Sequence, residues 1–149
     1  MLSVGISKMT AGQLQERSGT ISNLLAEIPA DISLWEAGDE HISPGSPTDQ
    51  LWTLLRQVDG IDWVIANKLL ARKRPMRLPV YDRLVRDLLG HPDRFWLSLR
   101  DTLAAEHAAH VARLTELRDR SGIGDDISLL RVFDVICWMH AKRQLRAAV

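Results

Sequence analysis

Hydrophobic residues along the chain recur at the three- and four-residue spacing of amphipathic helices. They do not alternate with polar residues over any useful length, so strands are not predicted. The predicted helices cover about residues 10–17, 18–28, 47–59, 63–73, 82–89, 93–120 and 127–146. We therefore expect an all-α fold of about seven helices, in one compact domain that spans residues 1–149.

Capping residues and loop composition set several of these boundaries. Ser46 followed by Pro47 predicts a helix start, because a hydroxyl caps the first turn and proline suits its first position. Asp126 is predicted to cap the last helix. Residues 36–47 hold three acids, two prolines and two glycines, so we expect an exposed loop there.

The last predicted helix, residues 127–146, is apolar on almost every side of its first half, which is typical of a central helix. Arg131 and Asp134 interrupt it three residues apart and therefore share a face. Two interpretations stay open for this pair. It forms a structural ion pair, or it lines a pocket together with Asp82 and Trp138.

Charge is unevenly distributed, although the net charge is zero. Residues 1–50 carry a net charge of −5, and residues 68–94 carry +5. Local positive charge attracts polyanions such as nucleic acid. The alternative, equally open, is that the basic segment binds the acidic N-terminal third of the same chain.

The stretch of about residues 48–74 predicts a helix-hairpin-helix: an apolar helix, a tight turn containing Gly60, and a second helix. Backbone amides at the start of a helix favour an anion, so such a turn suits a DNA phosphate. Basic side chains nearby add affinity that does not depend on base sequence. The residues expected to contact DNA are Gly60, Ile61, Lys68, Arg72, Lys73, Arg74 and Arg77.

Three parts of the chain resemble the helix-hairpin-helix DNA glycosylase superfamily. They are Val58–Asp62, Ala66-Asn67 and the segment Pro79-Val80-Tyr81-Asp82. The resemblance implies that Gly60 corresponds to the first hairpin glycine. It also implies that Asp82, within a segment of about residues 78–90, corresponds to the catalytic aspartate. Through residues 51–82 and 128–139 the chain also resembles an uncharacterised actinobacterial family; this resemblance implies a related fold and does not imply any activity.

Several residues depart from the glycosylase pattern. Asp62 replaces the second hairpin glycine and puts a negative charge where a phosphate would sit. Val64 stands where bifunctional members have lysine, so a Schiff-base lyase mechanism lacks its amine. Tyr81 is an extra residue before Asp82, and Leu84 stands where many members have histidine.

The resemblance implies a monofunctional N-glycosylase in DNA repair. In that mechanism Asp82 would stabilise positive charge on the sugar while a flipped base occupies a pocket. The expected pocket residues are Tyr81, Trp63, Arg131, Asp134 and Trp138, with Trp96 as a further stacking candidate. The alternative for Asp82 is a cap on the helix that begins at Arg83. The alternative for the protein is a non-catalytic nucleic-acid-binding or protein-interaction module, so enzyme activity stays open.

Other classes of site are not predicted. Cys137 is the only cysteine, which excludes an internal disulfide and favours a buried, inert thiol. His107 and His110 share a helix but have no clear third ligand, so no metal and no cofactor are expected. No leader pattern opens the chain, and no apolar run approaches the roughly 18 residues of a membrane span. We therefore expect a cytoplasmic protein without a membrane partner, located at the nucleoid if it binds duplex DNA.

Overall fold

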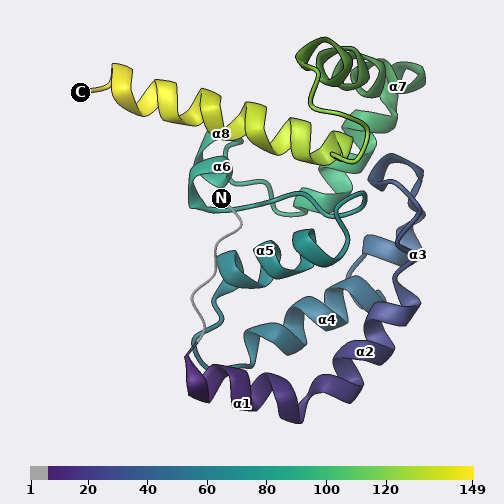
Figure 1. Ribbon diagram of the computed structural model, residues 1–149, viewed down its shortest axis with the longest axis vertical. Helices are drawn as coiled ribbons and strands as arrows, with labels where there is room; N and C mark the ends of the chain where they lie inside the picture. Colours follow the sequence, from purple (N-terminus) through teal and green to yellow (C-terminus); the bar gives the residue numbers. More distant parts are fainter. Residues whose placement is uncertain (1–6) are drawn as a thin grey trace.

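The computed structural model describes residues 7–149, and these residues form helices with no β-strand, which confirms the predicted all-α fold. The elements are α1 (Lys8–Glu16), α2 (Ser18–Glu27), the 3₁₀ turn η1 (Leu34–Glu36), α3 (Asp39–Ile42), α4 (Pro47–Arg56), α5 (Trp63–Lys73), α6 (Arg83–Leu88), α7 (Phe95–Ser121) and α8 (Leu129–Ala147). In Figure 1, α1, α2, α4 and α5 gather in one half, and α6, α7 and α8 in the other. No helix within the described residues is long and apolar enough to cross a bilayer.

Helix starts follow their caps, although one cap differs from the prediction. Ser46 accepts a hydrogen bond from the Asp49 N–H at 3.3 Å, and α4 begins at Pro47 as predicted. The prediction for Asp126 was wrong, because α8 begins at Leu129 and its cap is Ser128. The Ser128 hydroxyl also donates to a carbonyl far away in sequence, so a tertiary contact decides which residue caps the helix.

The predicted exposed loop at residues 36–47 was wrong in its central part. This segment forms α3, and the side chains of Ala37 and Ile42 are buried. Arg100 on α7 donates to the Ala37 carbonyl at 3.1 Å and forms an ion pair with Asp39 at 2.6 Å. The contacts with Arg100 therefore hold this polar segment against α7, which is distant in the sequence.

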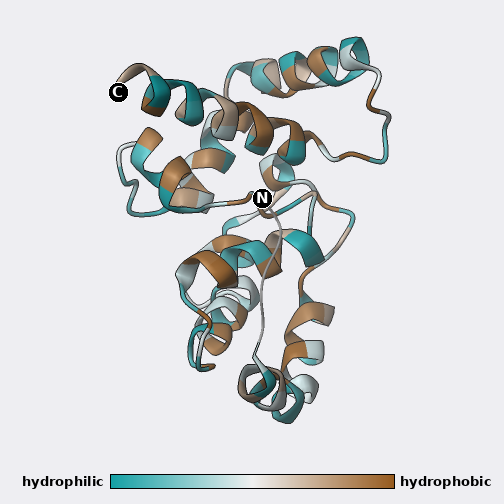
Figure 2. Ribbon diagram, turned by 60° about the vertical axis from the view of Figure 1, so that its left-hand side comes forward, coloured by the Kyte–Doolittle hydropathy of each residue, from teal (hydrophilic) through white to brown (hydrophobic). Residues whose placement is uncertain are grey.

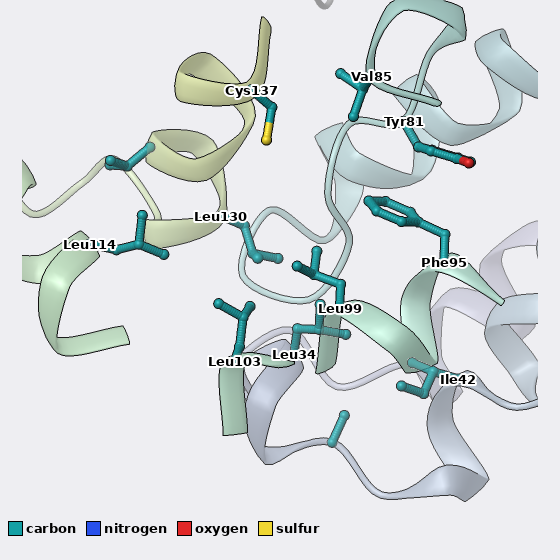
Figure 3. Close-up of a cluster of buried hydrophobic side chains, with 12 residues drawn as sticks. Leu34, Ile42, Tyr81, Val85, Phe95, Leu99, Leu103, Leu114, Leu130 and Cys137 are labelled. Carbon is teal, nitrogen blue, oxygen red and sulfur yellow. The ribbon is translucent and has the colours of Figure 1, made fainter. Parts of the chain in front are cut away.

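Two hydrophobic clusters hold the fold together. One lies mainly between α2, α4 and α5 and consists of Leu24, Ile28, Leu51, Leu55, Val58, Ile61, Ala66, Leu70 and Leu78. The other joins η1, α3, α6, α7 and α8 (Figure 3) and includes Leu34, Ile42, Tyr81, Val85, Phe95, Leu99, Leu103, Leu114, Leu130 and Cys137. Trp96 packs against both clusters and so connects the two halves.

Helix α7 is not continuous, although its sequence pattern allowed one long helix. Glu106, His107 and Ala108 have φ angles of 52°, 55° and 61°, which interrupt the α-helical backbone. The segment before the break contributes Leu99 and Leu103 to the second cluster, and the segment after it contributes Leu114. Both segments therefore keep an apolar contact with the core.

The prediction that α8 is a central helix was wrong. Val135, Ile136 and Met139 are 45%, 42% and 47% exposed. Figure 1 shows the C-terminal part of α8 extending beyond the other helices, and Figure 2 shows hydrophobic residues along this helix. Cys137 faces the core instead, where burial raises the pKa of its thiol to about 11, as expected of an inert cysteine.

Candidate functional site

The turn between α4 and α5 is covered by α1. Gly60 has a φ of 85°, a left-handed backbone conformation that glycine adopts without strain. The Thr10 hydroxyl donates to the Asp59 carbonyl at 2.8 Å, and Gln13 makes two further hydrogen bonds to Asp59, at 2.7 and 2.8 Å. Ile61, expected to contact DNA, is a buried core residue instead. Much of this turn is therefore occupied by contacts within the chain.

The first turn of α5 already holds an anion, the carboxylate of Asp62. Its Oδ1 accepts the Ile65 N–H at 2.9 Å, and its Oδ2 pairs with Arg83 at 2.9 Å. The backbone hydrogen bond from Ile65 holds the pKa of Asp62 below its usual range; burial opposes this shift, and the Arg83 guanidinium lowers the pKa further. Asp62 thus occupies the position where a hairpin would bind phosphate.

Two of the arginines predicted to contact DNA have structural partners. Arg74 donates to the carbonyls of Ile28 at 2.7 Å and of Leu25, so it satisfies the C-terminal end of α2. Arg77 is completely buried and donates to the Ile32 carbonyl at 3.3 Å, and burial lowers its pKa. The assignment of Arg77 to a DNA-facing surface was therefore wrong.

The remaining basic residues of α5 lie near its C-terminal end. Arg72 and Lys73 are exposed, and Lys68 is half-buried. The alternative prediction, that the basic segment binds the acidic N-terminal third, agrees with the structure only in part. Arg74 and Arg77 do contact that third, but through its carbonyl groups and not through its carboxylates.

Asp82 is the cap of α6. Its Oδ1 accepts the Val85 N–H at 3.0 Å, and its side chain is half-buried. The capping interpretation is confirmed by this hydrogen bond. The catalytic role implied by the resemblance stays a prediction.

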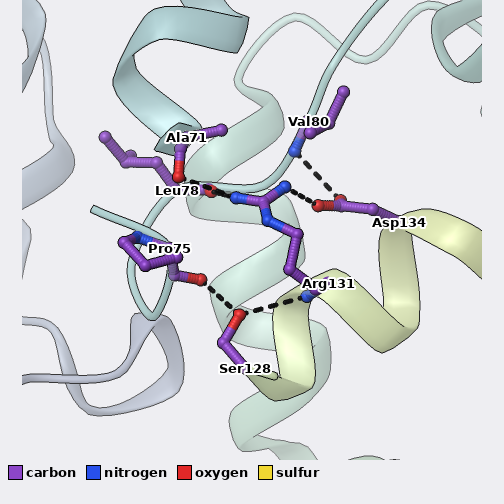
Figure 4. Close-up of polar contacts among 7 residues, drawn as sticks. All are labelled: Ala71, Pro75, Leu78, Val80, Ser128, Arg131 and Asp134. Carbon is purple, nitrogen blue, oxygen red and sulfur yellow. Dashed lines mark hydrogen bonds and ion pairs between the residues drawn. The ribbon is translucent and has the colours of Figure 1, made fainter. Parts of the chain in front are cut away.

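Arg131 and Asp134 form a clamp on the buried link between α5 and α6 (Figure 4). They make an ion pair with each other, and Arg131 donates to the Ala71 carbonyl at 2.7 Å. Asp134 accepts the Val80 N–H at 3.0 Å. Burial raises the pKa of Asp134 to about 7, opposed by Arg131 and by the Val80 hydrogen bond. The structural interpretation of this pair is confirmed.

A cavity with a volume of about 360 Å³ lies between α4, α5, α6 and the start of α7. Its aromatic lining residues are Trp52, Trp63, Tyr81, Phe95 and Trp96. Its charged lining residues are Arg56, Arg86, Arg94, Asp49 and Asp93. Arg131, Asp134, Trp138 and Asp82 do not line it, so the pocket predicted from the sequence is only partly assembled.

The aromatic rings of the cavity are fixed by one another and by arginines. Tyr81 stacks on Phe95 with ring centroids 4.0 Å apart and planes 15° apart, and it lies 5.7 Å from Trp63. The Arg86 guanidinium lies 4.7 Å from the Trp63 ring centroid, a cation–π distance. Arg56 lies 4.9 Å from the Trp52 ring in the same way.

The cavity therefore combines flat aromatic walls with three arginines and two aspartates, a small excess of positive charge. Among residues 7–149, Arg56 and Arg94 pair with no carboxylate and are exposed, so their charge is available to a ligand. The volume is in the range of small-ligand sites, which is roughly 300–1,000 Å³. Such a site suits a planar group joined to an anionic group.

Sequence reasoning found some of these residues and missed others. Trp63 and Tyr81 were predicted as pocket residues, and Trp96 as a stacking candidate; all three line the cavity. The missed residues include Arg56, Arg86, Arg94, Trp52 and Asn67. Trp52 and Arg56 stand four residues apart on one helix, and this spacing was an available signal of a cation–π pair. Trp138 is instead partly exposed on α8, beside Lys142.

No group of three histidine, cysteine, aspartate or glutamate side chains within residues 7–149 is arranged to hold a metal ion. The described site is thus an all-helical scaffold with an aromatic, arginine-rimmed cavity. The chain belongs to a family of unknown function (DUF6308), whose model matches residues 1–141. No curated protein and no solved structure shows a significant match to the chain.

Proposed function

We propose that this protein binds nucleic acid and accommodates one unstacked base in the aromatic cavity. The observation that supports the proposal is the joint presence of four tryptophan or tyrosine rings and three arginines around one cavity. Bases stack on aromatic side chains with roughly 1–3 kcal/mol each, and arginine binds phosphate through a planar fork of donors. The cavity offers both kinds of contact within the span of a nucleotide.

The rim arginines have distinct roles in this proposal. Arg56 and Arg94 are exposed and contact the phosphates on either side of the bound base. Arg86 lies over Trp63 and binds the nucleotide nearer the cavity wall. Because several phosphates displace counterions, binding weakens as salt concentration rises.

The α4–α5 pair is proposed as a variant helix-hairpin-helix, with DNA as the partner and a relation to the glycosylase superfamily. The support is the order of its parts: α4, a turn with Gly60 at positive φ, and α5. Because Asp62 fills the usual anion position, contacts to the strand come from the cavity rim. A single strand, or a duplex with an extrahelical base, is the expected ligand.

Fluorescence anisotropy with labelled single-stranded and duplex DNA tests the proposal. The double variant Arg56→Gln/Arg94→Gln is expected to bind about tenfold or more weakly, and its slope of log affinity against log salt falls by about 1.5–2. The matched control is Arg72→Gln/Lys73→Gln, which removes the same charge from the end of α5. Equal losses in both variants, or no DNA binding by the wild type, would contradict the cavity as the binding site.

A second candidate is a monofunctional N-glycosylase that uses Asp82. It is favoured by one observation, namely that the half-buried Asp82 directly follows the cavity residue Tyr81. Wild type and Asp82→Asn are incubated with duplexes carrying damaged or modified bases, and abasic sites are counted. Asparagine keeps the helix cap, so loss of product in the variant reports on chemistry. If the wild type forms no abasic sites on any duplex, this candidate fails.

A further inference from the structure

The Tyr81 hydroxyl is a buried polar group with no hydrogen-bond partner among the described residues. The side chain is 9% exposed, and the ring is fixed by the stack on Phe95. Figure 3 shows the hydroxyl pointing away from the core side chains Leu99 and Leu130. The side chain lines the cavity, so a ligand there is the available partner for this oxygen.

Packing does not account for this hydroxyl. A phenylalanine would make the same ring contacts without burying a polar group, and burying a hydroxyl without a partner is unfavourable. Tyr81 is also the only tyrosine of the chain. Burial raises its pKa, so the hydroxyl keeps its proton at neutral pH and can donate it in a hydrogen bond.

A second buried donor in the same cavity makes no hydrogen bond. The Nε of Arg86 is buried, and its ion-pair partner, the Asp87 carboxylate, lies 3.8 Å away, beyond hydrogen-bond distance; Arg86 lines the cavity beside Tyr81 and Trp63. The nearby Asn67 already uses its amide nitrogen on the Trp63 carbonyl, at 2.7 Å. Both the Tyr81 hydroxyl and the Arg86 Nε can donate a hydrogen bond, so an acceptor on the ligand would satisfy them.

We propose that Tyr81 reads a carbonyl oxygen on the base held in the cavity, so that the protein prefers guanine, thymine, uracil or cytosine to adenine. Adenine is the common base that lacks a carbonyl oxygen. The Arg86 side chain contributes to the same contact through its Nε, which makes no hydrogen bond within the described residues. This inference rests on the proposed nucleic-acid binding and adds a rule of base choice to it.

The test compares two strands of equal length that differ in one central base, guanine or 2-aminopurine, within an otherwise adenine sequence. 2-Aminopurine keeps the amino group and the ring of guanine but lacks its carbonyl oxygen. The wild type is expected to bind the guanine strand about tenfold more tightly, the effect of one good hydrogen bond. Tyr81→Phe is expected to bind the two strands alike, because it keeps the ring and loses only the hydroxyl.

The outcomes separate the two proposals. If the wild type binds both strands but does not distinguish them, the role of Tyr81 is overturned and nucleic-acid binding stands. A Tyr81→Phe variant that still prefers guanine overturns it as well. If the wild type binds neither strand, the proposed function itself fails. The wild-type comparison needs no variant, so it remains decisive even if Tyr81→Phe folds poorly.

Discussion

The clamp on α8 and the cavity differ in how completely their buried polar groups are hydrogen-bonded. In the clamp, Arg131 and Asp134 bind each other; Arg131 also donates to the Ala71 carbonyl of α5, and Asp134 accepts the Val80 N–H of the link between α5 and α6. In the cavity, the Tyr81 hydroxyl has no hydrogen-bond partner among the described residues, and the Arg86 Nε makes no hydrogen bond, although it lies 3.8 Å from the Asp87 carboxylate. Since most buried polar groups in proteins are hydrogen-bonded, the clamp is explained by folding alone and the cavity is not.

The α4–α5 turn resembles the clamp, because its polar groups have partners within the chain. Asp59 is held by Thr10 and Gln13 of α1, and Asp62 satisfies the first turn of α5. A hairpin that would offer free amides to a phosphate is here closed by its own chain. This contrast favours the cavity over the turn as the proposed ligand site.

The largest expected effect comes from breaking the clamp. Asp134→Leu leaves Arg131 buried without its carboxylate, which typically costs about 3–5 kcal/mol of unfolding free energy. Urea unfolding measures this loss. The double variant Arg131→Met/Asp134→Leu is expected to lose less than the sum of the single variants, because no unpaired charge remains. Additive losses would contradict the coupling between the two residues.

A smaller loss is expected from Gly60→Ala in the turn. Alanine at a φ of 85° is strained, and its Cβ would lie 2.9 Å from the Thr10 hydroxyl oxygen. Together these effects are expected to cost about 1–3 kcal/mol in urea unfolding. The matched control is Gly12→Ala, at a position in α1 where a Cβ meets nothing within 4 Å. That change is expected to stabilise the protein, and a loss as large as that at Gly60 would sink the explanation.

Asp62→Ala removes the carboxylate that caps the start of α5, and its effect on the unfolding free energy is expected to depend on pH. Loss of this cap is expected to cost about 0.5–2 kcal/mol near pH 7. The native-state pKa of Asp62 is below its ordinary value of 3.8, so its contribution is complete above that pH and is lost as pH falls through the native pKa. The stability gap between wild type and variant should therefore close under acidic conditions. A gap that keeps its full size as the solution is made more acidic would exclude the charged cap as its cause.

Local signals explain how much of the fold could be predicted from the sequence. The Ser46-Pro47 start and the limits of α5 depend on residues within one or two turns, and both were predicted correctly. The segment at residues 36–47 was assigned to an exposed loop because its polar composition hides the contact with Arg100. Arg77 looked like a surface charge for the same reason, since its partner Ile32 is 45 residues away.

The cavity shows the same limit at the level of the site. Trp63 and Tyr81 were predicted because they flank the motifs that resemble glycosylases. Arg86 belongs to α6 and Arg94 directly precedes α7, and only the packing of these elements against α4 and α5 brings the two arginines to one cavity. Sequence spacing cannot place residues on four separate elements around one cavity.

The smallest expected effect is a gain in stability, and it tests most directly the comparison between the clamp and the cavity. Tyr81→Phe removes a buried hydroxyl without a partner, so it is expected to raise the unfolding free energy by about 1 kcal/mol. The matched control is Thr10→Val, which removes a buried hydroxyl that donates to Asp59 at 2.8 Å, and it should destabilise by a similar amount. Thermal unfolding of both variants shows whether each change stabilises or destabilises the protein.

A bound strand that carries guanine should then stabilise the wild type more than Tyr81→Phe, because the ligand supplies the missing partner. Loss of stability in Tyr81→Phe without ligand would mean that the hydroxyl is already satisfied in the free protein, and the contrast with the clamp would disappear.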